Sequence, residues 1–458
     1  MTNKNSLIRI IAGALVLSSF AMCTKSINKI DQPLSPAQGA EASNLQTQAP
    51  AIATYTVQPS EWMVDGTKIA AGTIVYIPAG KRGALLLKNF KGTAAAPIIV
   101  VNKGGKVTFS TAITASYGFK TQNCQYFKIL GNGVSTIKYG FDVNGGNIGM
   151  TMDDLSTDFE IANVEVRNSG FAGIMAKTDP SCDPATWRGH FTMKNVIIRD
   201  NYVHKTGGEG LYIGNSFYAD GVSISCGKVL PHDVVNAKIY RNLTDSTGSE
   251  GIQVGSATSG CEIYGNLVKT PGISPFSAYQ DNGIQIGEGT GGKCYNNQIR
   301  NAPGNGIIVL GLGDNLVFNN YIINSKSYGI FADSRYTPGP HFQFINNTIV
   351  ASVLGGIKLN SETIPMNTVI NNVIIQANTS LAIIRKSTSV KLTASNNYVN
   401  ANVSTCKFVN YNAGDFHLLS SSPLINKGAN VLSYGVSFDY YGIKRPNGTA
   451  FDIGATEY

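Results

Sequence analysis

The 458-residue chain is rich in Gly, with 50 residues, and poor in charge, since 36 Lys and Arg and 28 Asp and Glu make up only 14% of it. This length allows one large repetitive domain or two to three ordinary domains, and the composition favours many tight turns over long helices. The basic residues are scattered, without a basic run or a recognised binding motif, so we expect no nucleic acid as a partner.

Residues 1–22 have the pattern of an export signal. Lys4 and Arg9 precede the apolar run IIAGALVLSSFAM, which is too short to span a bilayer stably. The residues LSSFAMC resemble the lipobox of bacterial lipoproteins, in which Cys23 becomes the lipidated first residue, although Met22 replaces the usual small residue. We therefore predict an exported protein, at the cell surface or in the periplasm, anchored to the outer membrane by a lipid. Ordinary cleavage near Cys23 and release is the alternative.

Removal of the leader leaves 34 basic and 28 acidic residues, a net charge of +6 that mildly favours anionic partners. Residues 23–52 are rich in Ala, Ser, Gln and Pro without an apolar period, which predicts a flexible tether after the lipidated Cys. The folded part is expected to start at residue 53.

From there the chain repeats in two registers. The first is a Gly followed by alternating apolar residues, at Gly118, Gly140, Gly173, Gly210, Gly251, Gly283, Gly306, Gly329 and Gly356. The second is an Asn about nine or ten residues upstream, at Asn163, Asn201, Asn242, Asn297, Asn320 and Asn347, with Asn266 further off because of an insertion. The shortest steps between the glycines, 22 and 23 residues, are typical of a solenoid, and alternation with period two indicates strands.

A coil of this length must turn back several times to bring each Gly above the previous one, which stacks the coils about 4.8 Å apart. An Asn at the same place in each coil can bond to the next Asn and satisfy the backbone of a tight turn. The runs YGNLVK, YNNQIR, FNNYII and INNTIV resemble the asparagine ladder of right-handed β-helix proteins. A leucine-rich repeat also carries an Asn column, but its LxxLxL spacing is missing.

The two ends resemble the same family. Residues 53–110 are similar to the opening turns of secreted pectate-lyase-like β-helices, and residues 416–458 to their closing segment. The resemblance implies an all-β, single-stranded right-handed parallel β-helix over residues 53–415, closed by 416–458. It implies polysaccharide as the ligand but specifies the chemistry weakly, since this fold hosts lyases, hydrolases, epimerases and non-catalytic proteins.

Residues two and four after each Gly should face outward, and in that family this face is the substrate groove. We expect Lys177, Tyr212, Gln253 and Gln285 of this column to bind substrate, because their side chains suit sugar hydroxyls and carboxylates. A plain solvated sheet face would look similar.

The residue just before the Gly is Glu209 in one repeat and Glu250 in the next, followed by Asn282 beside Asp281. Adjacent coils place the two Glu backbones about 5 Å apart, so one carboxyl should hold a proton, or Ca²⁺ should lie between them with Asp281 nearby. The pair would suit a general acid with a nucleophile, or a metal that binds a uronate carboxylate. The alternative is that the side chains extend into water without a function.

Three residues after the ladder Asn stand His204, Asp245, Lys269 and Arg300, which we expect to flank the acids. A Lys, Arg or His there could remove the proton beside a neutralised uronate carboxylate in β-elimination. Each one alone could equally be a solvent-exposed residue without a function.

Three insertions border these coils: AKTDPSCDPATWRGH, NSFYADGVSISCGKVLPHD and PGISPFSAYQD. They carry Trp187, Tyr218 and Tyr279, flat side chains of the kind on which sugars stack. Cys182 and Cys226 lie in two of them, and we predict a disulfide because export permits one. Cys261 and Cys294, in strand-like runs, are expected to be buried thiols, and His190 and His232 do not make a zinc set.

The favoured prediction is a monomeric polysaccharide lyase acting on a uronate-containing polymer by β-elimination. Hydrolysis through Glu209 and Glu250 and a non-catalytic surface protein that binds glycan or a partner are the alternatives. The NTD, GDD and RIK patterns of polygalacturonases are missing, and no close copy of a lyase signature replaces them.

Overall fold

Short apolar runs with period two form parallel strands along nearly all of the chain that the structure describes. The computed structural model describes residues 52–334 and 339–458, which belong to a unit that spans Ala51–Tyr458. The export signal, Cys23 and the tether up to residue 51 lie outside the described residues. No helix in the described ranges is long and apolar enough to cross a membrane.

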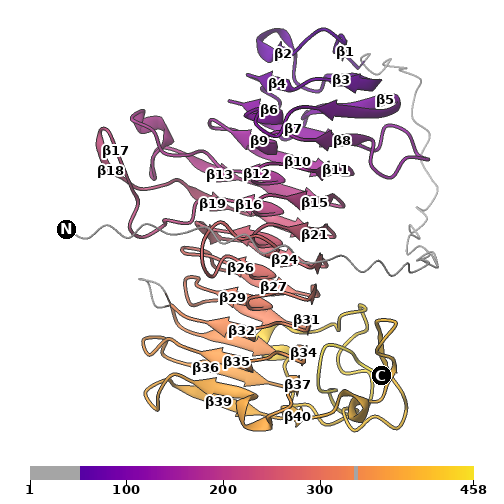
Figure 1. Cartoon of the computed structure of the whole chain (residues 1–458), viewed down its shortest axis with the longest axis vertical. Helices are drawn as coiled ribbons and strands as arrows, with labels where there is room; N and C mark the ends of the chain where they lie inside the picture. Colours follow the sequence, from indigo (N-terminus) through magenta and orange to yellow (C-terminus); the bar gives the residue numbers. More distant parts are fainter. Residues whose placement is uncertain (1–51, 335–338) are drawn as a thin grey trace, which may run out of the picture. The chain divides into compact units, whose positions relative to one another are not determined.

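Each coil contributes up to three strands, so the strands form three faces (Figure 1). The first face consists of β1 (Thr54–Thr56), β3 (Ile74–Arg82), β5 (Ile98–Ser110), β7 (Gln125–Leu130), β10 (Thr157–Ala162), β14 (Val196–Arg199), β20 (Lys238–Tyr240), β24 (Glu262–Tyr264), β27 (Lys293–Tyr295), β30 (Leu316–Phe318), β33 (Phe342–Ile345), β36 (Asn367–Ile370) and β39 (Leu392–Ser395). The second face consists of the end of β5, β8 (Phe141–Asn144), β11 (Val164–Arg167), β15 (Tyr202–Thr206), β21 (Leu243–Thr247), β25 (Leu267–Lys269), β28 (Gln298–Arg300), β31 (Tyr321–Ile323), β34 (Thr348–Val350), β37 (Val373–Ile375) and β40 (Tyr398–Asn400).

The third face is a separate sheet that carries the Gly repeat. It consists of β2 (Met63–Asp65), β4 (Leu85–Lys88), β6 (Tyr117–Gln122), β9 (Ile148–Asp153), β12 (Ile174–Ala176), β16 (Leu211–Ile213), β22 (Ile252–Val254), β26 (Ile284–Ile286), β29 (Ile307–Val309), β32 (Tyr328–Ala332), β35 (Gly355–Leu359) and β38 (Ile383–Arg385). Smaller elements are β13 (Thr192–Lys194), β19 (Asp233–Val235) and β23 (Ala257–Ser259) in one sheet, the hairpins β17 (Val222–Ile224) with β18 (Gly227–Val229) and β41 (Phe408–Asn410) with β42 (Asp415–Leu418), and 3-10 turns at Gly66–Lys68, Pro184–Thr186, Thr379–Leu381, Val403–Cys406 and Leu432–Tyr434.

The Gly repeats are successive floors of one column. Leu211 pairs with Ile252, and Ile252 pairs with Ile284, in parallel register. A Cβ on Gly210 would lie 2.6 Å from the carbonyl oxygen of Gly251, so the close approach of neighbouring coils excludes any side chain at that position. The predicted stacking is therefore confirmed for Gly118 and for the repeats from Gly173 to Gly356. It is wrong for Gly140, because the strand after it, β8, belongs to the second face, and Gly149 occupies the column between Gly118 and Gly173.

The side chains one and three residues after each Gly fill the interior. Leu211 and Ile213, for example, are fully buried, as are their counterparts in the coils on either side. Burial of one such aliphatic side chain stabilises the fold by about 1.5–3 kcal/mol. The thiols of Cys261 and Cys294 are buried in the same core and free, as the sequence predicted.

A ladder of Asn side chains, buried except for the last one, runs between the first and second faces. Its members are Asn201, Asn242, Asn266, Asn297, Asn320, Asn347, Asn372 and Asn397. At each step the side-chain amide and the backbone N–H of one Asn donate to Oδ1 of the next; the Nδ2 of Asn266, for example, lies 2.9 Å from Oδ1 of Asn297. The ladder leaves the turn without unsatisfied polar groups, which is why one residue type recurs there.

Asn163, predicted as a ladder member, is not one. Val164 occupies that register, because its N–H donates to Oδ1 of Asn201 at 3.0 Å. Asn163 lies one residue earlier, at a corner with a φ of 58°. Asn tolerates this left-handed conformation better than most residues, so the corner and the ladder both select it, which explains doublets such as Asn296–Asn297.

The C-terminal residues cover the second face of the last coils (Figure 1). The ring of Phe416 stacks on Tyr321 at 4.2 Å, and the side-chain amide of Asn346 donates to the carbonyl oxygens of Asp452 and Gly454. Arg445 is fully buried there and pairs with Glu457. The closing segment therefore leaves only the earlier coils of the second face open.

Candidate active site

The outer side of the third face is covered rather than open along the predicted substrate-binding column. Tyr212 is 7% exposed and Gln253 only 1%, and Lys177 and Gln285 are also buried. The amide of Gln285 donates to Oε1 of Gln253, and the amide of Gln253 donates to Oγ of Ser216 at 2.8 Å. Ser216, in the loop after β16, thus accepts a hydrogen bond that water or a sugar would accept if this row of side chains faced solvent. The expectation of an exposed row is wrong at these four residues.

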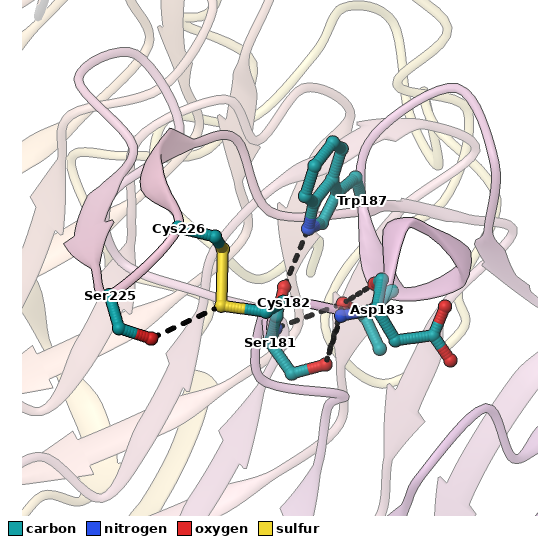
Figure 2. The surroundings of a disulfide bond; sticks show 7 residues. Ser181, Cys182, Asp183, Trp187, Ser225 and Cys226 are labelled. Atoms are coloured by element: carbon teal, nitrogen blue, oxygen red, sulfur yellow. Dashed lines mark hydrogen bonds between the residues drawn. A yellow bond between two sulfur atoms is a disulfide. The ribbon is translucent and has the colours of Figure 1, made fainter.

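Two of the inserted loops are joined by a disulfide (Figure 2). Cys182, after β12, is bonded to Cys226, in the turn between β17 and β18, with their Cα atoms 5.7 Å apart. The indole N–H of Trp187 donates to the carbonyl oxygen of Ser181 at 2.7 Å, so the ring stands beside the bond. Both loops are thereby held at one edge of the third face.

Arg188 and His232 make further contacts that hold the same two loops in place. The guanidinium of Arg188 lies 3.9 Å from the centre of the Tyr218 ring and donates to the Tyr218 carbonyl oxygen. The buried His232 accepts a hydrogen bond at Nε2 from the N–H of Thr178 at 3.0 Å, and its Nδ1 lies 2.9 Å from the carbonyl oxygen of Asp233. Burial lowers the pKa of His232 to about 4, so the ring is neutral, and Nδ1 is the donor.

Glu209 and Glu250 lie in the turns that lead into β16 and β22. Their backbones are stacked, because the N–H of Gly210 donates to the carbonyl oxygen of Glu250 at 2.9 Å. Both side chains are buried, with exposures of 1% and 0%. The two side chains therefore do not extend into water, as the alternative prediction had it, and they do not form an acid pair that is open to solvent.

Glu250 is one rung of a second polar ladder. Its Oε1 accepts from the amide of Asn282 at 3.0 Å, and Oδ1 of Asn282 accepts from the amide of Asn305 at 2.8 Å. The Oε2 atoms of Glu250 and Glu209 are buried and have no hydrogen-bond partner among the described residues. An ionised carboxylate only accepts hydrogen bonds, so a proton on one of the two acids is the donor that this part of the ladder needs.

The electrostatics of the pair follow from burial. Desolvation raises the pKa of Glu209 to about 7, against the opposing charge of Lys177. Desolvation, with a smaller contribution from the charges of Glu209 and Asp281, raises the pKa of Glu250 to about 8 against the opposing hydrogen bond from Asn282. At neutral pH the pair therefore holds at least one proton, mainly on Glu250, while Glu209 titrates near neutrality.

The loop before β26 covers the acid pair. The N–H groups of Gly272, Ile273 and Ser274 donate to the carbonyl oxygens of residues 249, 247 and 248, in the turn just before Glu250. Phe276 of this loop packs on Phe171, whose ring in turn contacts Tyr212. Tyr279, at the tip, is 86% exposed. The loop is thus bonded to the turn that precedes the buried Glu250.

Asp281 does not complete a metal site. Its carboxylate lies against Gly304 of the next coil, where an added Cβ would be 2.2 Å from Oδ1. In residues 52–334 and 339–458, no group of three or more His, Cys, Asp and Glu side chains is placed to hold a metal ion. The set Glu209, Glu250 and Asp281 is therefore not brought together as three ligands, and Ca²⁺ binding stays a prediction.

His204, Asp245, Lys269 and Arg300 lie on consecutive coils in one register, but on the second face. His204 stacks on Tyr202 at 4.1 Å and bonds to Glu165 at 3.2 Å. Lys269 pairs with Asp245. The expectation that this column flanks the acids is wrong, because the corner between the second and third faces turns its side chains in another direction.

Arg300 ends the column at the C-terminal segment. Its guanidinium lies 5.9 Å from the centre of the Phe416 ring. Arg300, which suggested β-elimination, thus contacts the closing segment, and Lys269 pairs with the acidic Asp245. The cation whose charge lowers the pKa of Glu209 is Lys177 instead.

Comparison with known proteins shows the class of fold. A family model described as a right handed beta helix region matches residues 220–399. No curated protein matches the chain significantly. The GH136 lacto-N-biosidase from Eubacterium ramulus is 13% identical with a TM-score of 0.50, over 72% of this chain and 62% of that chain. The protein is a right-handed parallel β-helix, which confirms the predicted fold.

Two lyases give weaker likenesses. The pectate lyase Pel9A is 17% identical with a TM-score of 0.42, over 85% of this chain and 88% of that chain. The alginate lyase from Paenibacillus sp. str. FPU-7 is 16% identical with a TM-score of 0.40, over 76% of this chain and 99% of that chain.

Proposed function

We propose that the protein is an exported carbohydrate-active enzyme that hydrolyses a glycosidic bond of a polysaccharide with Glu209 and Glu250. The observation that carries this proposal is the stacked, buried pair of carboxyls, one of which keeps its proton at neutral pH. Hydrolysis of glycosides needs one carboxylic acid and one carboxylate side by side. The basic residues that favoured β-elimination, His204, Lys269 and Arg300, lie on the second face. The arrangement of the acids therefore favours a hydrolase over a lyase.

The two acids have different roles in this proposal. Glu250 has the higher pKa and is the general acid that gives its proton to the leaving glycosidic oxygen. Glu209 is stabilised as a carboxylate by Lys177 and is the nucleophile or the base. Parallel side chains on neighbouring coils stand about 5 Å apart, a separation that suits a retaining reaction.

The loops support a carbohydrate as the substrate. Phe276 and Tyr279 are exposed on the loop that covers the acids, and an aromatic ring is a surface on which a sugar stacks. Displacement of this loop by a polysaccharide chain would open the pair and then exclude water again. The rigid, disulfide-linked loops on the opposite edge of the third face would hold the chain in place.

The test is turnover by the purified mature chain on neutral and uronic polysaccharides, followed by reducing ends and by the ultraviolet absorbance of an unsaturated uronate. We expect reducing ends without absorbance, and a loss of at least about 100-fold in Glu209→Gln and in Glu250→Gln. Glu262→Gln is the matched control, because that glutamate lies on the first face beside Tyr295 and should keep full activity.

Each other outcome contradicts the proposal in a recognisable way. Absorbance would indicate the lyase of the original prediction, with Lys269 and Arg300 as the residues to replace next. Full activity in both Glu variants would remove the acids from the reaction. No product from any polysaccharide would favour a non-catalytic glycan-binding protein.

A further inference from the structure

At the corner that leads into the first face, one residue per coil has a left-handed backbone. In five consecutive coils the residues are Tyr126, Asp158, Asn195, Asn236 and Gly260, with φ of 51°, 54°, 51°, 57° and 65°. They follow one another in register, as shown by the pairing of Gln125 with Thr157 and of Phe159 with Val196. Gly, Asn and Asp tolerate this conformation, whereas a bulky aromatic residue is strained in it. Tyr126 is therefore the exception within this column.

The strained residue lines two cavities. One, of about 210 Å³, is lined by Tyr126 together with Lys128, Asp158, Glu160 and Asn195, among others. The other, of about 370 Å³, shares Tyr126 and Asp158 with the first and is bordered by His190. Strain that the fold retains at a bulky residue is an indication of function, and here the strained residue contributes to the lining of both cavities.

The polar groups around the ring suit hydroxyl groups. Asp158 accepts from the amide of Asn195 at 2.5 Å, and this bond fixes two side chains that line the first cavity. Glu160 is neutralised by Lys128 at 2.9 Å and by Arg199. A carboxylate, an amide and a paired acid beside an aromatic face are the groups that bind sugar hydroxyls while the apolar side of the ring stacks.

We propose that a neutral sugar unit of a glycan binds at Tyr126, with its ring on the tyrosine and its hydroxyls on Asp158 and Asn195. A uronate is disfavoured, because the carboxylate of Asp158 would face its carboxylate and Lys128 is already paired with Glu160. The site is on the first face, away from Glu209 and Glu250, so it would hold the polysaccharide rather than cut it. The choice of a glycan as the ligand rests on the proposed function.

The loop that carries His190 makes this site rigid. It is the loop after β12, which is fixed by the bond between Cys182 and Cys226 and by Arg188. Phe191, next to His190, packs its ring on the buried His232 at 4.9 Å. A wall held in this way loses little freedom when the ligand binds, which favours affinity.

The decisive variant is Tyr126→Asn, because the proposal gives it opposite effects on binding and on stability. Binding is measured by calorimetry in the Glu250→Gln background, with cellohexaose as the neutral probe and trigalacturonate as the acidic probe. We expect cellohexaose to bind more tightly than trigalacturonate, and Tyr126→Asn to weaken its binding at least tenfold. The same substitution relieves the backbone strain and should raise Tm by about 1–2 °C. Tyr126→Phe keeps the ring and should bind within about threefold of the parent.

Asn236→Tyr is the reverse control: it places a tyrosine in the same column away from the two cavities, and should lower Tm without changing binding. Unchanged binding in Tyr126→Asn, a lower Tm in that variant, or tighter binding of trigalacturonate would each overturn the proposal. Turnover of a polysaccharide in wild type separates the two proposals. If wild type hydrolyses a polysaccharide but Tyr126→Asn binds the probe unchanged, only the site at Tyr126 is contradicted. If binding depends on Tyr126 but no polysaccharide is hydrolysed, only the proposed reaction is contradicted.

Discussion

Replacing Glu250 by Gln should remove much of the dependence of stability on pH. The pKa of Glu250 is about 8 in the folded chain against an ordinary value of 4.5, so the folded state holds the proton more tightly than the unfolded state. The sign follows from linkage: this contribution to stability is full below pH 4.5 and is lost as the pH rises through 8. One pKa unit corresponds to about 1.4 kcal/mol, so the loss for this residue alone is about 5 kcal/mol.

The substitution keeps the contacts and removes the titration. Gln retains an oxygen for the amide of Asn282, which lies 3.0 Å from Oε1, and it carries no proton that titrates in this pH range. The variant should therefore equal wild type at pH 5 and exceed its free energy of unfolding at pH 9 by several kcal/mol. Glu209, whose pKa is about 7, would still titrate and leave a smaller slope.

The assay is urea unfolding at pH 5, 7 and 9, followed by the fluorescence of the two Trp residues. Glu262→Gln, on the first face, serves as the control and should keep the pH slope of wild type. If the free energies of unfolding of Glu250→Gln and wild type changed with pH in parallel, the reasoning would be refuted. A variant less stable than wild type at pH 9 would also contradict the conclusion that Glu250 is buried in its protonated form.

Two further changes test the loops and the ladder. His232 has a pKa of about 4 when folded against 6.5 otherwise, so its stabilisation of the loops is full above pH 6.5 and about 3 kcal/mol is lost as the pH falls to 4. Protection factors for hydrogen exchange in residues 177–233, which are corrected for the intrinsic exchange rate at each pH, should fall over that range, and His232→Gln should abolish the change. Asn266→Ala removes two donated bonds and the acceptor for Asn242 and should cost about 2–4 kcal/mol in urea unfolding, whereas Asn163→Gly, at the corner, should cost less than about 0.5 kcal/mol.

The fold could be predicted because its determinants recur. A Cβ in the Gly column would come within 2.6 Å of a carbonyl oxygen of the next coil, and the Asn ladder satisfies a buried turn. Each requirement therefore selects the same residue type in most coils. The error at Asn163 arose because the corner and the ladder select the same residue type one position apart. Only the register of Val164 with Asn201 separates the two roles.

The candidate site could be predicted only in part, because burial depends on loops that have no period. Alternation correctly turned Gln253 away from the core, but nothing in it shows that Ser216 of the loop after β16 would bond to that side chain. The alternation of residues in the strands likewise does not reveal the angle at which the chain turns between β15 and β16. For this reason His204 was expected beside Glu209. Tyr126 was missed because it lies in neither repeat, although a Tyr aligned with Asp158 and Asn195 is a visible break in a column of turn residues.

The acid pair is best understood as a break in a ladder. Asn282 and Asn305 each offer a donor and an acceptor, so a column of Asn would satisfy itself at any pH. Glu209 and Glu250 in the same column can do so only while a proton is present, and each buries an oxygen that has no partner in the described residues. A sequence selected for stability alone would have Asn at both rungs. The cost of the two glutamates, which grows with pH, therefore favours a chemical use for the proton that they hold.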